Sequence, residues 1–263
     1  MKDIASLIKA DEVKAKELLK QVLGPSADFG TMSKVVEELL PESTRKLQEL
    51  CIFYENEMVR CRDAEAYFFG CLAGAAMIES FLLSISVLER KAVEGSRSFQ
   101  TSRKKVNRAY EQTALHWTLK DLIPLAEELE WIGPTVVDKD LVLALVEGYR
   151  EILPIAKPDI TDESLEAVLD TLKRRPDVAF LVLMQSMRNL VHGGRCVRLR
   201  KQLASTGFSD WAKLVMILTV EIRDCLILRL RSIYPRYLTD LLSSPAGLSA
   251  LAKLLVRVVE PST

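Results

Sequence analysis

Three side chains that can act on a phosphodiester lie within one helical turn of each other, and two glycines follow them. They are Arg188, Asn189 and His192, and His192 is one of only two histidines in the 263 residues. An imidazole can both accept and donate a proton near neutral pH. A guanidinium one turn away could bind a phosphate or stabilise charge that develops on it. The four-residue step from Arg188 to His192 brings the two side chains close to one face of a helix.

The same residues also have structural interpretations. Glu79 is the one charged residue in the apolar stretch 66–88, and a buried carboxylate needs a partner, so we expect Arg188 to pair with it. His192 lies just before Gly193-Gly194, which should end the helix, and a cation at that end is favoured by roughly 0.3–1 kcal/mol. A structural role for either side chain does not exclude a chemical one.

The charge of the chain is balanced but unevenly distributed. Lys+Arg and Asp+Glu both total 36, so net charge gives no reason to expect an acidic or a basic partner. Two stretches contain basic residues and no acid: the segment between Asp177 and Asp210, and residues 95–108. They could follow a phosphate backbone, or form ordinary solvated surfaces. The candidate RNA-binding side chains are Arg195, Arg198, Arg200, Lys201, Arg103, Lys104 and Lys105.

The pattern of apolar residues has a helical period in almost every segment, and no stretch alternates as a strand would. It predicts an all-α protein, an up-down helical bundle with additional N- and C-terminal helices. Thr118 should cap one helix together with Asp121, as in a capping box. The polar, basic stretch 95–107 is expected to be a loop, and Ser209 is expected to cap a long helix that ends before Pro235. The other predicted helices span residues 1–23, 31–40, 42–62, 64–93, 108–115, 138–154, 161–175, 177–192, 196–204 and 210–233, with a break or kink at Pro41 and short helices after Pro235 and Pro245.

The predicted helices suggest three parts of the chain. Residues 1–62 form an N-terminal helical element packed on the rest, because the most apolar helices all come later. Residues 63–234 form the bundle and residues 235–263 the C-terminal helices. No Gly/Ser-rich linker separates these parts.

Cysteine usage and motifs exclude several classes of site. The five cysteines are odd in number and contain no Cys-x-x-Cys pair, which predicts neither a zinc site nor a disulfide framework. Reduced thiols and the absence of a signal-peptide pattern favour a cytoplasmic location. No phosphate-binding loop, dinucleotide fingerprint or nucleophile elbow occurs, so no cofactor and no metal is expected.

Residues 66–88 are long enough to span a bilayer. The carboxylate of Glu79 would oppose insertion by roughly 2.5–3.5 kcal/mol. We therefore expect this stretch to be the buried central helix of a bundle, without a membrane partner.

The order of these motifs resembles the HEPN superfamily of small α-helical domains. The residues that carry the resemblance, over about 64–232, are Ala76-Met77-Ile78-Glu79-Ser80-Phe81-Leu82, then Thr118-Leu119-Lys120-Asp121-Leu122-Ile123, Ala126-Glu127-Glu128-Leu129-Glu130-Trp131-Ile132, Arg188-Asn189-Leu190-Val191-His192-Gly193-Gly194-Arg195, and the closing apolar helix from Trp211. The last motif is similar to the Arg-Asn…His-Gly-Gly-Arg signature of an uncharacterised bacterial branch.

The resemblance implies an up-down bundle that dimerises and, in many members, acts as a metal-independent endoribonuclease in toxin–antitoxin or anti-phage systems. By position, Arg188 would be the signature arginine, Asn189 the polar residue and His192 the proton-transferring histidine. The chain departs from the pattern in one respect: three residues separate Arg188 from His192, where the catalytic signature has four or more. Either the helix ends before His192 and restores the geometry, or the nuclease activity has been lost.

Three functions therefore remain open. The first is an RNA-directed HEPN-like homodimer, such as a ribonuclease with a cognate antitoxin or another protein partner. The second is a catalytically inactive module of the same fold that dimerises or binds partners. The third is a structural or adaptor bundle unrelated to the family.

Overall fold

The computed structural model describes residues 39–106, 117–156, 170–189 and 206–244, together with the single positions Glu17, Gly247 and Ser249. The described part contains helices and no strand, which confirms the predicted all-α class. Its helices are α3 (Glu42–Asp63), α4 (Tyr67–Leu88), α5 (Arg90–Gly95), α6 (Arg97–Val106), α8 (Leu119–Glu128), α9 (Lys139–Ala156), α11 (Pro176–Arg188) and α13 (Thr206–Leu242).

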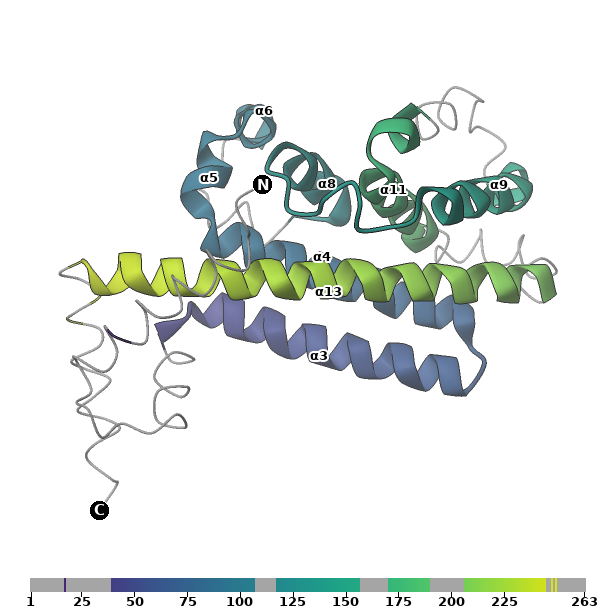
Figure 1. Ribbon diagram of the computed structural model, residues 1–263, viewed down its shortest axis with the longest axis horizontal. Coiled ribbons are helices and arrows are strands. Elements are labelled where there is room, and N and C mark those ends of the chain that lie inside the picture. Colours follow the sequence, from purple (N-terminus) through teal and green to yellow (C-terminus); the bar gives the residue numbers. More distant parts are fainter. Residues whose placement is uncertain are drawn as a thin grey trace, which may run out of the picture.

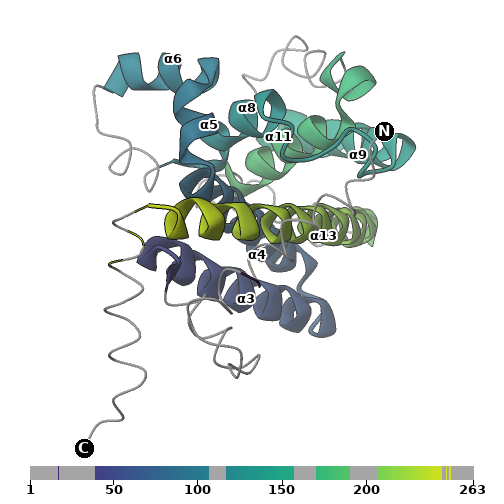
Figure 2. The ribbon, with the colours of Figure 1, turned by 60° about the vertical axis from the view of Figure 1, so that its left-hand side comes forward.

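Three long helices, α3, α4 and α13, lie side by side along the molecule (Figure 1). The shorter helices α5, α6, α8, α9 and α11 lie on the side of α4 and α13 that faces away from α3 (Figures 1 and 2). Helix α4 runs parallel to α13, since the thiol of Cys71 near its start contacts the carbonyl of Ala212 and Glu89 after its end pairs with Arg229. Helix α3 runs antiparallel to both.

Helix α4 is the centre of the core. It is long and apolar enough to cross a membrane, and 72% of its most apolar window is buried inside the fold. The hydroxyls of Ser80, Ser84 and Ser86 donate to carbonyls three or four residues earlier in the same helix, so these buried polar groups are satisfied locally. Length and hydropathy alone do not separate a core helix from a membrane span.

Glycines allow α4 and α13 to approach closely. A Cβ atom at Gly74 would lie 2.9 Å from the Cγ2 atom of Thr219, and one at Gly70 would lie 2.8 Å from the side chain of Met216. These distances are shorter than ordinary van der Waals contact, so only glycine fits at the crossing without displacement of its neighbour.

The stretch 95–107 was predicted to be a loop, and this prediction is wrong, because residues 97–106 form helix α6. The hydroxyl of Ser96 accepts a hydrogen bond from the amide of Phe99, and the Glu128 carboxylate accepts the amides of Arg97 and Ser98 at 2.6 and 2.8 Å. An acid thirty residues away therefore caps this helix. The polar composition of residues 95–107 gives no information about a cap from a distant part of the chain, so it predicted a loop.

Two predicted boundaries of apolar helices also differ from the structure. The helix expected over 64–93 is divided at Glu89 into α4 and α5. Helix α13 begins at Thr206 rather than after Ser209, and it continues through Pro235 to Leu242 instead of ending at 233. Leu238 and Leu242 are 4% and 5% exposed, so their burial compensates for the backbone hydrogen bond that a proline removes.

The predicted cap of α8 is confirmed. Thr118 and Asp121 form the expected capping box at the start of α8. Pro176 occupies the first turn of α11, where its missing amide hydrogen is no loss. The helix predicted over 196–204 lies outside the described residues, as does that over 1–23 except for the single position Glu17.

Candidate functional site

Glu79 lies on the face of α4 that meets α8 and α11, and its side chain is 14% exposed. One carboxylate oxygen, Oε2, accepts the backbone amide of Leu119 at 2.7 Å. Leu119 is the first residue of α8, so the negative charge lies at the positive end of that helix. A carboxylate placed there is stabilised by the amide and by the helix dipole together.

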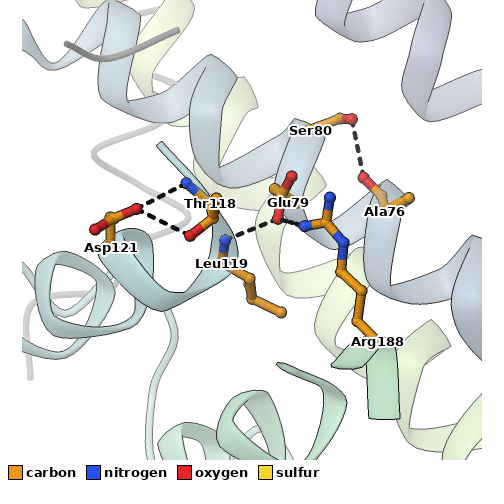
Figure 3. A network of polar contacts seen from close by, with 7 residues as sticks. All are labelled: Ala76, Glu79, Ser80, Thr118, Leu119, Asp121 and Arg188. Carbon is orange, nitrogen blue, oxygen red and sulfur yellow. Dashed lines mark hydrogen bonds and ion pairs between the residues drawn. The ribbon is translucent and has the colours of Figure 1, made fainter. Parts of the chain in front are cut away.

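Arg188 is the last residue of α11, and its guanidinium extends towards the same oxygen of Glu79 (Figure 3). Its Nη1 group donates to Oε2 of Glu79, which confirms the predicted ion pair. The Arg188 side chain remains 43% exposed. The pair therefore joins α4, α8 and α11 at a point that solvent reaches from the Arg188 side.

The start of α8 has a second carboxylate of its own. Oδ2 of Asp121 accepts both the amide of Thr118, at 3.0 Å, and its hydroxyl, at 2.9 Å (Figure 3). Carboxylates of the protein itself thus accept the amides of both Thr118 and Leu119. At this end of α8, internal carboxylates occupy the position where a phosphate would otherwise bind.

Of the remaining predicted catalytic residues, only Asn189 lies in the described part. It is the C-terminal cap of α11 and is exposed, with its backbone amide donating to the carbonyls of Gln185 and Met187. His192 lies outside the described residues. Four candidate RNA-binding residues also lie outside the described part: Arg195, Arg198, Arg200 and Lys201. For the other three, Arg103, Lys104 and Lys105, the backbone belongs to α6 but the side chains are not described.

Sequence reasoning paired Glu79 with Arg188 but missed the third member of the group, the Leu119 amide. The spacing of Thr118 and Asp121 predicted that a helix begins next to Leu119. Nothing in the sequence indicated that this helix start contacts the middle of α4.

A second polar junction was missed entirely. Glu89, between α4 and α5, accepts the indole N–H of Trp131 at 2.7 Å and pairs with Arg229 of α13 at 2.8 Å. Its side chain is 15% exposed. The sequence placed Glu89 inside a continuous helix and so predicted no special role for it.

Arg175 forms a third junction, at the start of α11. It makes a two-pronged contact with the fully buried Asp177, through Nε at 3.0 Å and Nη2 at 2.7 Å. Its guanidinium also donates to the carbonyls of Glu127 and Ile132. The hydrogen bond to Asp177 raises the pKa of Arg175 above its ordinary value. All the polar atoms are satisfied within the protein, which is typical of a structural clamp rather than a binding site.

The described cysteines are not activated nucleophiles. Burial raises the pKa of the Cys51 thiol to about 12 and also raises the pKa values of Cys61, Cys71 and Cys225. A reactive cysteine needs the opposite shift. Within the described ranges, no three His, Cys, Asp or Glu side chains lie close enough to hold a metal ion.

A groove of about 350 Å³ runs between α3, the start of α4 and α13. None of its lining residues belongs to α8 or α11, so it is separate from Glu79 and Arg188. Its walls are mostly apolar and are formed by Met58, Val59, Arg62, Tyr67, Lys213, Met216, Ile217 and Val220.

Comparison of the chain with protein-family models, with curated proteins and with solved structures finds no match in any of the three.

Proposed function

We propose that this protein binds RNA in the manner of a HEPN domain and cleaves it without a metal ion, with His192 as the proton-transferring group. The observation that supports the proposal is the anchored, half-exposed guanidinium of Arg188 at the end of α11. Four residues later in the chain comes His192, followed by Gly193-Gly194 and the basic residues Arg195 to Lys201.

The ion pair with Glu79 would hold the Arg188 side chain in one orientation. A guanidinium that is already oriented loses less conformational freedom when it binds a phosphate, and it can stabilise charge on the pentacoordinate phosphorus. Asn189, at the helix end, would orient Arg188 or the histidine.

Cleavage without a metal requires a base for the ribose 2′-hydroxyl and an acid for the leaving 5′-oxygen. One histidine does not readily fill both roles in a single step. A two-fold dimer would supply a second His192 and a second Arg188 to one cleft. The biological setting that we propose is a cytoplasmic bacterial defence or toxin–antitoxin system.

A catalytically inactive, partner-binding module of the same fold is the second candidate. It is favoured by the way one Glu79 oxygen binds both the Leu119 amide and Arg188, since this joins three helices and needs no ligand to explain it. In this case Arg188 would be a structural residue.

An RNA-cleavage assay in EDTA separates the two. Single-stranded RNA is incubated with the wild-type protein, with His192→Ala and with Arg188→Lys, which keeps the charge but loses the planar fork. We expect wild-type cleavage to survive chelation, His192→Ala to reduce it by about 10²- to 10⁴-fold, and Arg188→Lys to reduce it less.

The matched control is Lys173→Ala, which removes an exposed cation of the segment before α11 that pairs only with Asp170 among the contacts described. It should cleave like the wild type. If wild type and His192→Ala behave alike, the nuclease proposal fails. RNA binding that weakens steeply with salt would then still support an RNA-binding role, whereas no binding would favour the partner-binding module.

A further inference from the structure

The outward face of α3 carries a row of residues that no other described helix covers. Leu50 and Phe53, at its centre, are 42% and 53% exposed, although both are large apolar side chains. The opposite face of α3 packs on the core through Leu47, Cys51 and Met58. Figures 1 and 2 show α3 at the edge of the molecule, on the side away from α11.

The row has the spacing of a coiled-coil seam. Its positions alternate in steps of four and three residues, which keeps side chains on one face of a helix that pairs with another helix. In order, the members are Lys46, Leu50, Phe53, Glu57 and Arg60, and Glu42 precedes them by one further turn.

When a second copy of this row runs in the opposite direction, charges of opposite sign face each other. From one end the order is acid, base, two apolar residues, acid, base. An antiparallel second copy places Leu50 level with Phe53 of that copy and Lys46 level with its Glu57, and it places Glu42 within one residue of the level of its Arg60. Each pair occurs twice because the arrangement has a two-fold axis between Leu50 and Phe53.

Among the described residues of one chain, these charges pair within α3. Lys46 contacts Glu42 at 2.7 Å, and Arg60 contacts Glu57 at 2.6 Å. The side chains of Glu42, Lys46 and Arg60 are 69%, 69% and 75% exposed and that of Glu57 is 33% exposed, so such pairs contribute little to stability on their own. A parallel arrangement would place like charges at the same level, which disfavours it.

We infer that α3 forms an antiparallel, two-fold interface with α3 of a second copy of this chain. Two exposed apolar residues per copy make a small interface, so the dimer should be in equilibrium with the monomer in the micromolar range. Because α3 and α11 lie on opposite sides of α4 and α13, this interface does not bring two Arg188 side chains together. It is independent of the proposed nuclease.

Charge reversal provides the test, with mass measured by sedimentation velocity at roughly 10–100 µM protein. Lys46→Glu and Glu57→Lys each convert both copies of one attractive pair into a repulsive one, so each variant alone should lose the association through α3 and sediment as a smaller species than the wild type. A mixture of the two variants should form a heterodimer, since every pair across the axis is again of opposite sign. Combining both changes in one chain should restore the homodimer.

Lys91→Glu is the control, since it reverses a charge on α5 that is 91% exposed and pairs with Asp240. It should dimerise as the wild type does. A wild-type protein that stays monomeric over this range overturns the inference. So does a Lys46→Glu variant that dimerises unchanged, or a mixture that fails to form the heterodimer.

Discussion

At the scale of single residues, the group formed by Glu79, Arg188 and Leu119 shows how a charge is accommodated in an apolar core. Removing a carboxylate from water is unfavourable by several kcal/mol unless hydrogen bonds replace the lost solvation. Here one backbone amide and one guanidinium do so, and they come from two different helices. Arg188, the arginine of the signature-like motif, therefore also holds three helices together.

Glu79→Gln should lower the free energy of unfolding by about 1–3 kcal/mol, because it leaves Arg188 and the Leu119 amide with a weaker acceptor. Arg188→Met should lower it by about 0.5–1 kcal/mol, since the arginine is 43% exposed and solvent screens the pair. Urea denaturation of both variants and of the double variant measures the coupling between the two side chains.

The control for this prediction is Asp170→Asn, in the exposed pair of Asp170 and Lys173, where both side chains are about 70% exposed. It should change stability by less than about 0.5 kcal/mol. An effect of Glu79→Gln no larger than that of Asp170→Asn would show that the buried carboxylate is not structural.

At the scale of helices, packing depends on a few positions where no side chain fits. Gly148 of α9 is one of these, because a Cβ atom there would lie 2.6 Å from Cδ1 of Trp211. The indole cannot move away easily, since its Nε1 donates to the carbonyl of Leu145 and its ring stacks on Tyr149. The contact between α9 and α13 thus has a fixed spacing.

Gly148→Ala should destabilise the protein by about 1–3 kcal/mol through overpacking, although alanine is the better helix former. Gly95→Ala is the matched control, since nothing lies within 4 Å of a Cβ atom at that position of α5. It should leave stability unchanged or raise it by up to about 1 kcal/mol. Thermal unfolding followed by circular dichroism compares the two, and equal melting temperatures would contradict the packing argument.

At the scale of the whole molecule, the core keeps several ionisable groups neutral. Burial raises the pKa values of Cys51 and Tyr234 to about 12, and it raises that of Cys71 as well. These groups lie on α3, α13 and α4, so their raised pKa values depend on the packing of all three long helices. An unfolded chain releases these protons at lower pH than the folded protein does.

Stability should therefore decline as the pH rises above about 9, towards the folded-state pKa values near 12. In this window the folded protein binds more protons than the unfolded chain, so raising the pH favours unfolding. The urea midpoint measured near pH 8 and near pH 10 gives the slope. Cys51→Val with Tyr234→Phe should reduce that slope, and a midpoint independent of pH would show that these groups are not buried.

The sequence by itself determined the all-α class, the cap formed by Thr118 and Asp121, and the pairing of Glu79 with Arg188. Helical period and capping depend on neighbours in the chain. The ion pair could be inferred because a lone acid in an apolar helix needs a cation.

Only the tertiary structure decided that the polar stretch after Gly95 is helical, that α13 continues past Pro235, and that the start of α8 meets Glu79. Each of these depends on a partner that is distant in the chain: Glu128 for the first, the surface that buries Leu238 and Leu242 for the second, and the middle of α4 for the third. A local pattern carries no information about such partners, because burial and long-range hydrogen bonds exist only once the helices have packed.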